Sequence, residues 1–341
     1  MRILNIDGNY FVPEFRELGH EVLTIGPRPG DDVVIDRQLP LGRLVDILDS
    51  CGFVPDVVLW CDIGKPPGVF GFEDLPAATI AFSIDQYCNP WHVPYSGGFD
   101  LVLVAQKDYL DLFAHESLSR RARWMPLFCE PRYDTPDDAP RDIPVSFVGT
   151  VSGSINVERA RFLEAFRRVH PLYVTSGRYQ PIFARSRIVL NQSAAGEVNF
   201  RVFQAAACGA AVLTEDVENG LGELFRVGQD ILVYPRGDAT AAAVVAARAL
   251  ADAEGLARIA QSGRERVLTR HSSLSRARTI LREADALVRA GSWLRRRAER
   301  ATVRSELAKA FLSLATDAKL PLPPEHRAKY AHIGNLYMNR G

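Results

Sequence analysis

The residues best suited to binding chemistry lie between Arg187 and Pro235, around the segment VNFRVFQAAACG. Asn199 precedes a helical run that starts near Phe200, and Asn at such a position caps a helix by accepting a backbone N–H. Arg201 lies in the first turn of this run, where a guanidinium can form a two-pronged hydrogen bond to a phosphate. A surface ion pair is the alternative for Arg201. The pattern predicts a cationic helix start that suits an anionic ligand.

Two Gly-containing turns in the same half of the chain also suit a phosphate. Gly149 and Thr150 end an extended run and open a loop that continues with serine and glycine through 152–154. Small residues let backbone amides approach a phosphate, although an ordinary tight turn is the alternative. Gly222 and Glu223 lie in a second turn, where the carboxylate can accept hydrogen bonds from sugar hydroxyls or simply favour a helix start. Neither turn forms a GxGxxG or Walker motif.

A second set of candidates follows the extended runs of the first half. Asp85 comes directly after ATIAFSI, and His92 follows it at a short distance in the chain. A carboxylate and an imidazole at a strand end can orient or deprotonate a hydroxyl, although Asp85 can instead cap the turn that follows. Tyr87 and Trp91 lie beside them and can stack on a sugar face, and Gly8 and Asn9, which follow the first predicted strand, are further candidates for contacts with the molecule that carries the hydroxyl.

Extended and helical runs alternate through the first half and must position these residues. The extended runs are rich in Val, Ile and Leu and apolar on both faces, which is typical of strands buried in a parallel sheet. Helical segments over 11–20, 41–52 and 107–116 separate them. The predicted strands are 2–6, 21–26, 56–62, 78–85 and 100–106. Such alternation predicts a doubly wound α/β domain.

A linker and a second alternating set follow. Residues 129–142 are rich in Pro and Asp and have no apolar period, which predicts a linker. Further strands are predicted at 145–150, 172–176, 187–193, 210–216 and 230–235. The expected organisation is an N-terminal Rossmann-like domain over 1–130, a linker over 131–143, a second domain over 144–285 and a helical extension over 286–341. Ligands bind such sheets at the carboxyl ends of the strands.

The helical extension begins with a strongly basic segment, SWLRRRAERATVRSELAKAFLSLA, that carries an apolar stripe. We expect it to pack back on the first domain. The alternative is a helix that contacts a partner protein or a membrane surface through Trp293 and the arginines at 295–297. No apolar run approaches the roughly 18 residues of a membrane span.

The charge distribution and the cysteine spacing further limit the classes of protein to which the chain can belong. The net charge is zero, but the first 140 residues carry twice as many acidic as basic residues and the balance reverses afterwards, which suits an anionic ligand on the second half. The five cysteines are scattered singly, which argues against a zinc site or a disulfide framework and favours a reducing compartment. The chain opens with an extended run and has no signal-peptide core. We expect a cytoplasmic protein without a metal, a cofactor or a nucleic-acid partner.

A series of short sequence motifs between about Ala81 and His271 resembles, in content and order, the CgeB-like, spore-maturation branch of the group 1 glycosyl transferases. The motifs are DQYCNPWH, FDLVLVAQKDYLDLF, WMPLFCEP, VSFVGT, NFRVFQAAACGAAVLTED, LGELFRVGQDILVYP and RVLTRHS. The resemblance covers over half the chain and implies the GT-B fold: two Rossmann-like parallel-sheet domains that face a cleft, with a C-terminal helical extension. It also implies a sugar nucleotide on the second domain, an acceptor against the first, and a leaving diphosphate neutralised by helix ends and basic side chains instead of a metal.

The resemblance assigns roles to residues and shows one departure. Gln204 stands where related families usually carry a Glu whose carboxylate accepts hydrogen bonds from the donor ribose, and an amide keeps one acceptor oxygen. Related retaining enzymes carry another Glu eight residues earlier, where this chain has Gly196 with Glu197 beside it. The implied donor-binding residues are Gly149, Thr150, Asn199, Arg201, Gln204, Gly222 and Glu223. The resemblance adds Glu197 to the catalytic candidates Asp85 and His92, which are inferred from their position after a strand.

The resemblance, together with these residues, implies a hexosyltransferase-type glycosyltransferase that is retaining and metal-independent. It would move a sugar from a nucleotide-diphosphate donor, its co-substrate, to a hydroxyl of a glycan, a protein or a small molecule. Gln204 motivates one alternative, a sugar- or nucleotide-binding protein on the same fold that has lost catalysis. A second alternative is a Rossmann-type enzyme of another class, such as a dehydrogenase, which the missing GxGxxG after the first strand disfavours.

Overall fold

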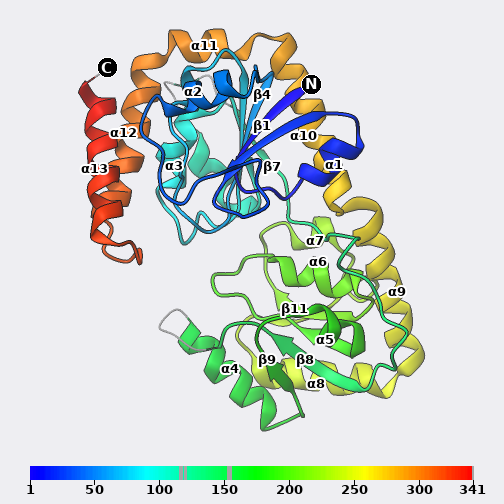
Figure 1. Cartoon of the computed structure of the whole chain (residues 1–341). Helices are drawn as coiled ribbons and strands as arrows, with labels where there is room; N and C mark the ends of the chain where they lie inside the picture. The colour runs from blue at the N-terminus through cyan, green and yellow to red at the C-terminus, as the bar shows by residue number, and fades with distance from the viewer. Residues whose placement is uncertain (115–117, 119–120, 152–155, 340–341) are drawn as a thin grey trace. The chain divides into compact units, whose positions relative to one another are not determined.

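The chain folds into two compact units in a computed structural model that describes residues 1–114, 118, 121–151 and 156–339 (Figure 1). Unit 1 comprises Met1–Met125 and Ala277–Gly341, and unit 2 comprises Pro126–Arg276. The chain therefore enters unit 2 once and returns to unit 1 inside helix α10 (Ser273–Arg289). The segment predicted as a linker, 131–143, lies within unit 2.

Unit 1 is built on a seven-stranded parallel sheet with the order β3-β2-β1-β4-β5-β6-β7. Its strands are β1 (Arg2–Asp7), β2 (Glu21–Gly26), β3 (Val33–Val34), β4 (Val57–Cys61), β5 (Ala78–Ser83), β6 (Leu101–Val104) and β7 (Arg121–Trp124). The central strands β4, β5 and β6 are buried along their whole length, as their Val-, Ile- and Leu-rich sequences predict. The short strands β3 and β7 were not predicted.

Short helices connect these strands, and a set of C-terminal helices completes unit 1. The connecting helices are α1 (Val12–Glu17), α2 (Arg43–Ser50) and α3 (His92–Tyr95), with 3-10 turns η1 (Phe72–Asp74), η2 (Ser96–Gly98) and η3 (Lys107–Phe113). The C-terminal helices are α11 (Ser292–Ala298), α12 (Arg300–Thr316) and α13 (Pro324–Asn339). Helix α12 packs against α13, α3 and η2 (Figure 1). Its Leu307 and Phe311 share one core with Trp60 of β4 and Tyr95 of α3.

Arg296 of α11 anchors this helical extension to the sheet of unit 1. Its side chain is only 4% exposed and pairs with Asp100, which precedes β6. The same guanidinium donates to the hydroxyl of Thr79 at 3.0 Å and to the carbonyl of Ala77 at 2.8 Å. The neighbouring Arg295 and Arg297 are exposed. The basic stretch of α11 therefore contributes one arginine to the interior of unit 1.

Unit 2 is built on a five-stranded parallel sheet with the order β12-β11-β10-β8-β9. Its strands are β8 (Ile143–Val148), β9 (Tyr173–Thr175), β10 (Ser186–Leu190), β11 (Ala211–Asp216) and β12 (Leu232–Pro235). Its helices are α4 (Val157–Arg167), α5 (Gln180–Arg185), α6 (Phe200–Ala207), α7 (Leu221–Leu224), α8 (Ala239–Ala251) and α9 (Ala253–Arg270). Its core joins strand residues such as Phe147 and Leu213 to small residues of α8. The predicted class of two parallel-sheet α/β domains is confirmed.

The anchoring role of Arg296 can be tested by Arg296→Ala. Removing it leaves the buried Asp100 carboxylate without its cation, so we expect the free energy of unfolding to fall by about 3–5 kcal/mol. Urea denaturation followed by circular dichroism measures this loss. Arg295→Ala is the matched control, because Arg295 is the exposed neighbour on the same helix, and we expect it to change stability by less than about 0.5 kcal/mol. Equal losses in the two variants would contradict the anchoring role.

Candidate functional site

The carboxyl ends of β8 and β10 form the switch point of the second sheet, because β9 lies on one side of β8 and β10 on the other. Ligands of open α/β sheets bind at such points. Arg201 reaches this switch point from the first turn of α6. Its Nε donates to the Val148 carbonyl at 3.0 Å, and its Nη1 donates to Oδ1 of Asn191 at 2.6 Å. The guanidinium also lies over the Phe147 ring, 4.5 Å from its centroid.

The loop after β8 makes room for this guanidinium. A Cβ atom at Gly149 would lie 2.6 Å from Nη2 of Arg201, so a side chain there would displace the guanidinium from this position. The carbonyl of Thr150 accepts a hydrogen bond from Nη1 of Arg159 at 3.0 Å, which brings a second guanidinium to the same loop. Residues 152–154, which complete the predicted phosphate loop, lie outside the described residues. Gly149 and Thr150 are therefore brought together with Arg201.

Helix α6 begins as the sequence predicts. Oδ1 of Asn199 accepts the backbone N–H of Arg201 at 3.1 Å, which is an N-cap hydrogen bond. Gln204 lies three residues after Arg201, and both side chains are half-buried while most other positions of α6 are buried. Residues three apart share one face of a helix. Arg201 and Gln204 thus form the accessible polar face of α6.

Positive charge gathers around this switch point. Burial, together with the neighbouring charge of Arg159, lowers the pKa of Arg201 to about 10, so the guanidinium remains a cation at neutral pH. A third guanidinium, from the exposed Arg236 that follows β12, lies 3.0 Å from the position of a Cβ at Gly196. Arginines from α4, from α6 and from the turn after β12 therefore lie near the loops that follow β8 and β10, an arrangement that suits a ligand with several negative charges.

Glu197, predicted as a catalytic candidate, stabilises its own loop. Its Oε1 accepts the N–H of Ala194 at 3.0 Å, and its Oε2 accepts the N–H of Ala195 at 2.7 Å. The residue is 5% exposed. Both carboxylate oxygens thus serve backbone donors of the loop between β10 and α6. In this structure Glu197 shapes the loop that carries Asn199.

Glu215, near the end of β11, links the carboxyl ends of β10, β11 and β12 through hydrogen bonds. One carboxylate oxygen accepts the N–H of Ser193 at 2.9 Å and also its hydroxyl. The other oxygen accepts the N–H of Gly237, which follows β12, at 3.2 Å. Asn191 adds a parallel link, because its Nδ2 donates to the Thr214 hydroxyl at 2.9 Å. These hydrogen bonds hold in place the carboxyl ends of the strands beside which Arg201 lies.

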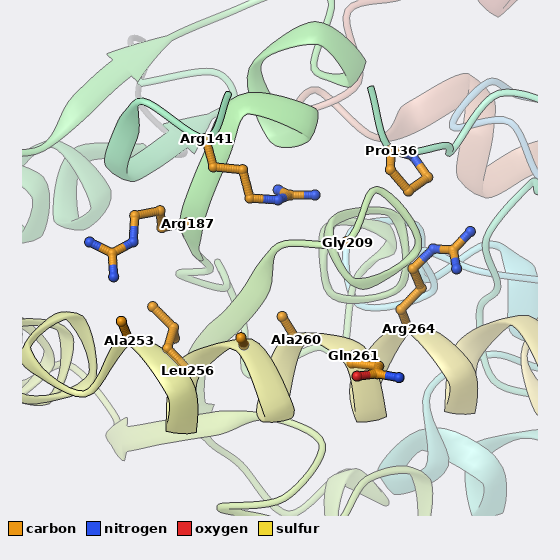
Figure 2. A pocket seen from close by; sticks show the side chains of 10 residues that line it. Pro136, Arg141, Arg187, Gly209, Ala253, Leu256, Ala260, Gln261 and Arg264 are labelled. Atoms are coloured by element: carbon orange, nitrogen blue, oxygen red, sulfur yellow. The ribbon is translucent and has the colours of Figure 1, made fainter. Parts of the chain in front are cut away.

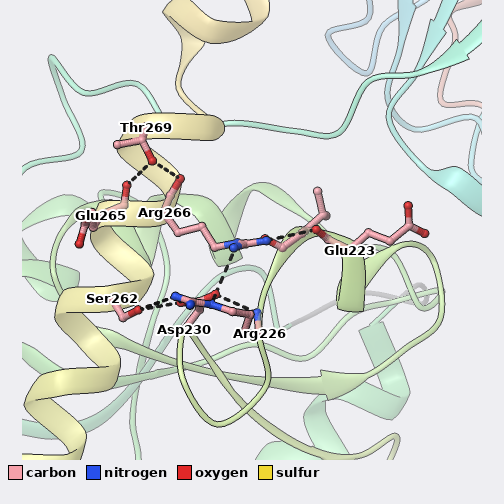
Figure 3. A network of polar contacts seen from close by, with 8 residues as sticks. Glu223, Arg226, Asp230, Ser262, Glu265, Arg266 and Thr269 are labelled. Atoms are coloured by element: carbon pink, nitrogen blue, oxygen red, sulfur yellow. Dashed lines mark hydrogen bonds and ion pairs between the residues drawn. The ribbon is translucent and has the colours of Figure 1, made fainter.

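The second predicted phosphate turn is α7 and its N-terminal loop. Gly222 and Glu223 belong to α7, whose final carbonyls accept hydrogen bonds from Arg266, at 3.3 Å in the case of Glu223 (Figure 3). Burial alone would raise the pKa of Asp230. Hydrogen bonds from the side chain and backbone of Arg226 and from the side chain of Ser262 instead lower this pKa to about 2. The ionised Asp230 lies 3.4 Å from Nε of Arg266. This network holds α7 through its main chain, while the Glu223 carboxylate points away from it (Figure 3).

Unit 1 has a switch point of its own, between β1 and β4. A cavity of about 490 Å³ opens there, lined by Asp7, Gly64 and Gly68 and by the 320–323 turn of the C-terminal extension. Asp7 has a left-handed backbone, with φ of 65°. Its carboxylate accepts hydrogen bonds from Nε1 of Trp60 at 3.1 Å and from the N–H of Gly68 at 3.2 Å. Burial raises the pKa of Asp7 to about 7.

The predicted acceptor-side residues next to Asp7 lie at the same edge. Gly8 is buried, with its Cα close to the Cys61 carbonyl at the end of β4, and Asn9 is half-buried. A Cβ at Gly8 would lie 2.5 Å from that carbonyl. Gly8 and Asn9 therefore follow a strand end, as expected, and flank the residue that lines the cavity.

Asp85 and Tyr87 remain half-buried in the loop after β5. The hydroxyl of Tyr87 donates to Oδ1 of Asp85 at 3.1 Å. The N–H of Asp85 donates to Oδ2 of Asp62 at 2.8 Å, and Oδ1 of Asp62 accepts the N–H of Gly64 at 2.7 Å. Asp62 thus links the loop that carries Asp85 to the loop that lines the cavity.

His92 and Trp91 lie inside the core of unit 1, which differs from their predicted exposure at a strand end. Each residue is 1% exposed. Nδ1 of His92 shares a hydrogen bond with the Ser83 hydroxyl at 2.9 Å, and burial lowers the pKa of His92, so the imidazole stays neutral. The short helix α3 turns both side chains toward Trp60. Neither side chain is accessible to a substrate in this structure.

Three carboxylates that organise these edges escaped the sequence analysis: Asp7, Asp62 and Glu215. Asp7 is the last residue of β1, Asp62 directly follows β4, and Glu215 is the second-last residue of β11. Each is almost fully buried. Their common signal is an acidic residue at the carboxyl end of an apolar strand, which singled out Asp85 but was not applied to the other strands.

Two further properties follow from the described part of the chain. Across it, no group of three or more His, Cys, Asp or Glu side chains is placed to hold a metal ion. Among its helices, none combines the length and the apolar character needed to cross a bilayer.

Comparisons with known proteins relate unit 2 to glycosyl transfer. Residues 139–282 match a family model described as glycosyl transferase-like, and this range contains the whole switch point around Arg201. No curated protein matches the chain by sequence. The match covers less than half of the chain and extends from unit 2 into the first residues of unit 1 that follow it.

Solved structures share the fold of the whole chain. Sucrose-phosphate synthase from Thermosynechococcus elongatus is 12% identical, with a TM-score of 0.61 over 85% of this chain and 100% of its own. A glycosyltransferase from Rickettsia africae is 11% identical, with a TM-score of 0.62 over 84% and 98%. Anabaena HepE in complex with UDP-glucose is 12% identical, with a TM-score of 0.62 over 84% and 100%. The predicted GT-B fold is confirmed, and membership of the CgeB-like branch stays a prediction.

The buried Asp7 carboxyl should make stability depend on pH. Its pKa is about 7 in the folded protein, against an ordinary value of 3.8 for an aspartic acid in water. The carboxyl therefore contributes stability that is complete below about pH 4 and is lost as the pH rises through 7. Asp7→Asn removes this titration, and Asn tolerates the left-handed backbone. We expect the free energy of unfolding of the wild type, relative to the variant, to fall by about 1.4 kcal/mol per pH unit between pH 5 and 6.5.

Urea denaturation at several pH values measures this difference. Glu73→Gln is the matched comparison, because burial also raises the pKa of Glu73 to about 7, and it should give the same sign. A difference between wild type and Asp7→Asn that stays constant across this range would refute the assignment.

Proposed function

We propose that the chain is a glycosyltransferase that transfers a hexosyl group from a nucleotide-diphosphate sugar to a hydroxyl-bearing acceptor. The observation that carries the proposal is the coincidence of the glycosyl transferase-like match, residues 139–282, with the arginine-rich switch point of unit 2. The complex of Anabaena HepE with UDP-glucose, which shares the fold, is consistent with a sugar nucleotide as the donor.

Donor binding is assigned to unit 2. Arg201 and Arg159 are positioned to offset the charge of a diphosphate, with the start of α6 contributing its dipole. Gln204, on the same face of α6 as Arg201, is available to bind the donor ribose through its amide. As the bond between the sugar and the diphosphate breaks, negative charge grows on the leaving group. Fixed cations stabilise that charge without reorganisation.

Acceptor binding is assigned to unit 1. The cavity at the β1–β4 switch point offers a largely apolar wall and the Asp7 carboxyl. Asp85, with Tyr87 beside it, is the accessible candidate for orienting a hydroxyl, whereas the buried His92 is a positioning residue that supports Ser83. Retention of the anomeric configuration and metal-independent transfer belong to the proposal and are supported by the sequence resemblance. The cations of unit 2 supply the charge neutralisation that such transfer needs.

A second candidate function is a sugar-nucleotide-binding protein without catalysis. Two observations favour it. The carboxylates of Glu197 and Glu215 in unit 2 both accept hydrogen bonds from loop N–H groups, and Gln204 carries no charge. Hydrogen bonds from the loop amides hold these carboxylates in place within their own loops and so favour a structural role for them.

Titration calorimetry and a turnover assay distinguish the two functions. We expect at least one of UDP, GDP, dTDP or CDP to bind at millimolar or lower concentration, and the corresponding nucleotide sugar to be hydrolysed or transferred. Tight binding without any turnover would favour the second candidate. No binding of any of the four diphosphates would overturn both.

The role of Arg201 predicts a specific loss. Arg201→Ala removes a charge-assisted hydrogen bond to the diphosphate, so the binding free energy of the nucleotide should weaken by roughly 1.5–3 kcal/mol. Calorimetry measures the change, and circular dichroism checks that the variant is folded. Arg258→Gln is the matched control, because Arg258 is an exposed arginine of α9 that pairs with Glu254 and lines neither cavity, and it should bind the nucleotide like the wild type. Unchanged affinity in Arg201→Ala would remove Arg201 from the donor site.

A further inference from the structure

Unit 2 contains a second cavity, at the edge of its sheet opposite the Arg201 switch point. Its volume is about 430 Å³. Arg141 precedes β8, Arg187 is the second residue of β10, and Gly209 precedes β11, so the wall is made of residues at the amino ends of the strands. Helix α9 forms the other wall, with Leu256 and Ala260 facing Arg141 across the space (Figure 2). No residue predicted to bind the donor lines this cavity.

The cavity is lined by three arginine side chains and by an apolar face of helix α9. Three guanidinium groups border the space, and no lining residue is a carboxylate. Arg141 extends over the cavity, and Arg187 and Arg264 lie toward its two ends (Figure 2). The face of α9 below them is built from Ala253, Leu256, Ala257 and Ala260. The volume lies within the range of small-molecule sites, about 300–1,000 Å³.

The three arginines are held by main-chain carbonyls. Arg141 donates to the carbonyls of Ser186 at 2.6 Å and Cys208 at 2.8 Å. Arg187 donates to Leu250 at 3.3 Å, and Arg264 donates to Ala207 at 3.2 Å. Carbonyls satisfy donors but supply no net negative charge. None of the ion pairs formed among the described residues includes any of the three arginines.

Capping of helix ends explains only part of this arrangement. Arg141 and Arg264 bind the last carbonyls of α6, which is a common use of a cation. A guanidinium has five N–H donors, and the hydrogen bonds above use a single nitrogen of Arg187 and a single nitrogen of Arg264. Burial lowers the pKa of Arg141, and the nearby charge of Arg264 acts in the same direction. Gly209, with φ of 78°, lets Arg141 approach, because a Cβ there would lie 2.6 Å from its Nη2.

We propose that this cavity is a binding site for a small organic oxyanion, a phosphate or carboxylate joined to an apolar body. The anionic group pairs with the guanidinium group at one end of the cavity, that of Arg187 or that of Arg264, because a guanidinium matches a planar oxyanion in geometry. The apolar body covers the alanine-rich face of α9. The site is independent of the proposed glycosyl transfer, since none of its residues belongs to the donor-binding set.

Phenyl phosphate is the probe, because it joins an oxyanion to an apolar ring. We expect calorimetry on the full chain to show that it binds at least tenfold more tightly than either inorganic phosphate or phenol. The double variant Arg187→Gln/Arg264→Gln should weaken binding at least tenfold while retaining Arg141, which caps α6. Ala260→Phe should also weaken binding by filling the cavity without changing its charge. Circular dichroism establishes that each variant is folded.

Two controls separate this site from others. Arg258→Gln changes an arginine on α9 that does not line the cavity and should bind phenyl phosphate like the wild type. Arg201→Ala should also bind the probe normally, which distinguishes the cavity from the diphosphate site. The proposal is overturned if the wild type does not bind phenyl phosphate, or if it binds inorganic phosphate equally well. It is also overturned if Arg201→Ala abolishes binding, or if Arg258→Gln weakens it as much as the double variant.

Discussion

The carboxyl edge of the second sheet depends on the burial of one guanidinium. Removing the charge of Arg201 from water costs several kcal/mol unless the protein replaces the lost hydration. The Val148 carbonyl, the Asn191 side chain and the Phe147 ring provide that replacement. Each of them constrains the edge in turn, because Asn191 must be fixed and residue 149 must lack a side chain. The arrangement presents a cation in a defined place, which a flexible surface arginine would not do.

The carboxylates at both switch points accept hydrogen bonds from backbone N–H groups of the neighbouring loops. Parallel strands end in loops whose N–H groups lack sheet partners, and buried N–H groups must be satisfied. Glu215, Glu197 and Asp62 accept such donors from neighbouring loops. Asp7 does the same with Gly68 and also accepts from Trp60. The loops therefore keep fixed positions, which allows a site to be preorganised.

The sequence predicted the parts of this protein that depend on local pattern. Val- and Ile-rich runs identified ten of the twelve strands, and Asn199 was correctly expected to cap α6. Strands β3 and β7 escaped because their runs are too short or too polar to show a pattern. The burial of His92 and Trp91 could not be predicted, since it depends on how α3 packs against Trp60 and α12. Arg296 looked like a surface residue because its partner, Asp100, lies far away in sequence.

Helix α6 shows how one short element can connect two edges of a sheet. Arg201 holds its first turn to the loops after β8 and β10, and Arg141 and Arg264 hold the carbonyls at its last turn. Between these ends the helix is lined with alanines that pack closely on β11. A helix of eight residues has little stability of its own, so its position is set by these end contacts and by packing. A rotation of α6 would break guanidinium hydrogen bonds at both ends, and the two edges are therefore mechanically joined through this helix.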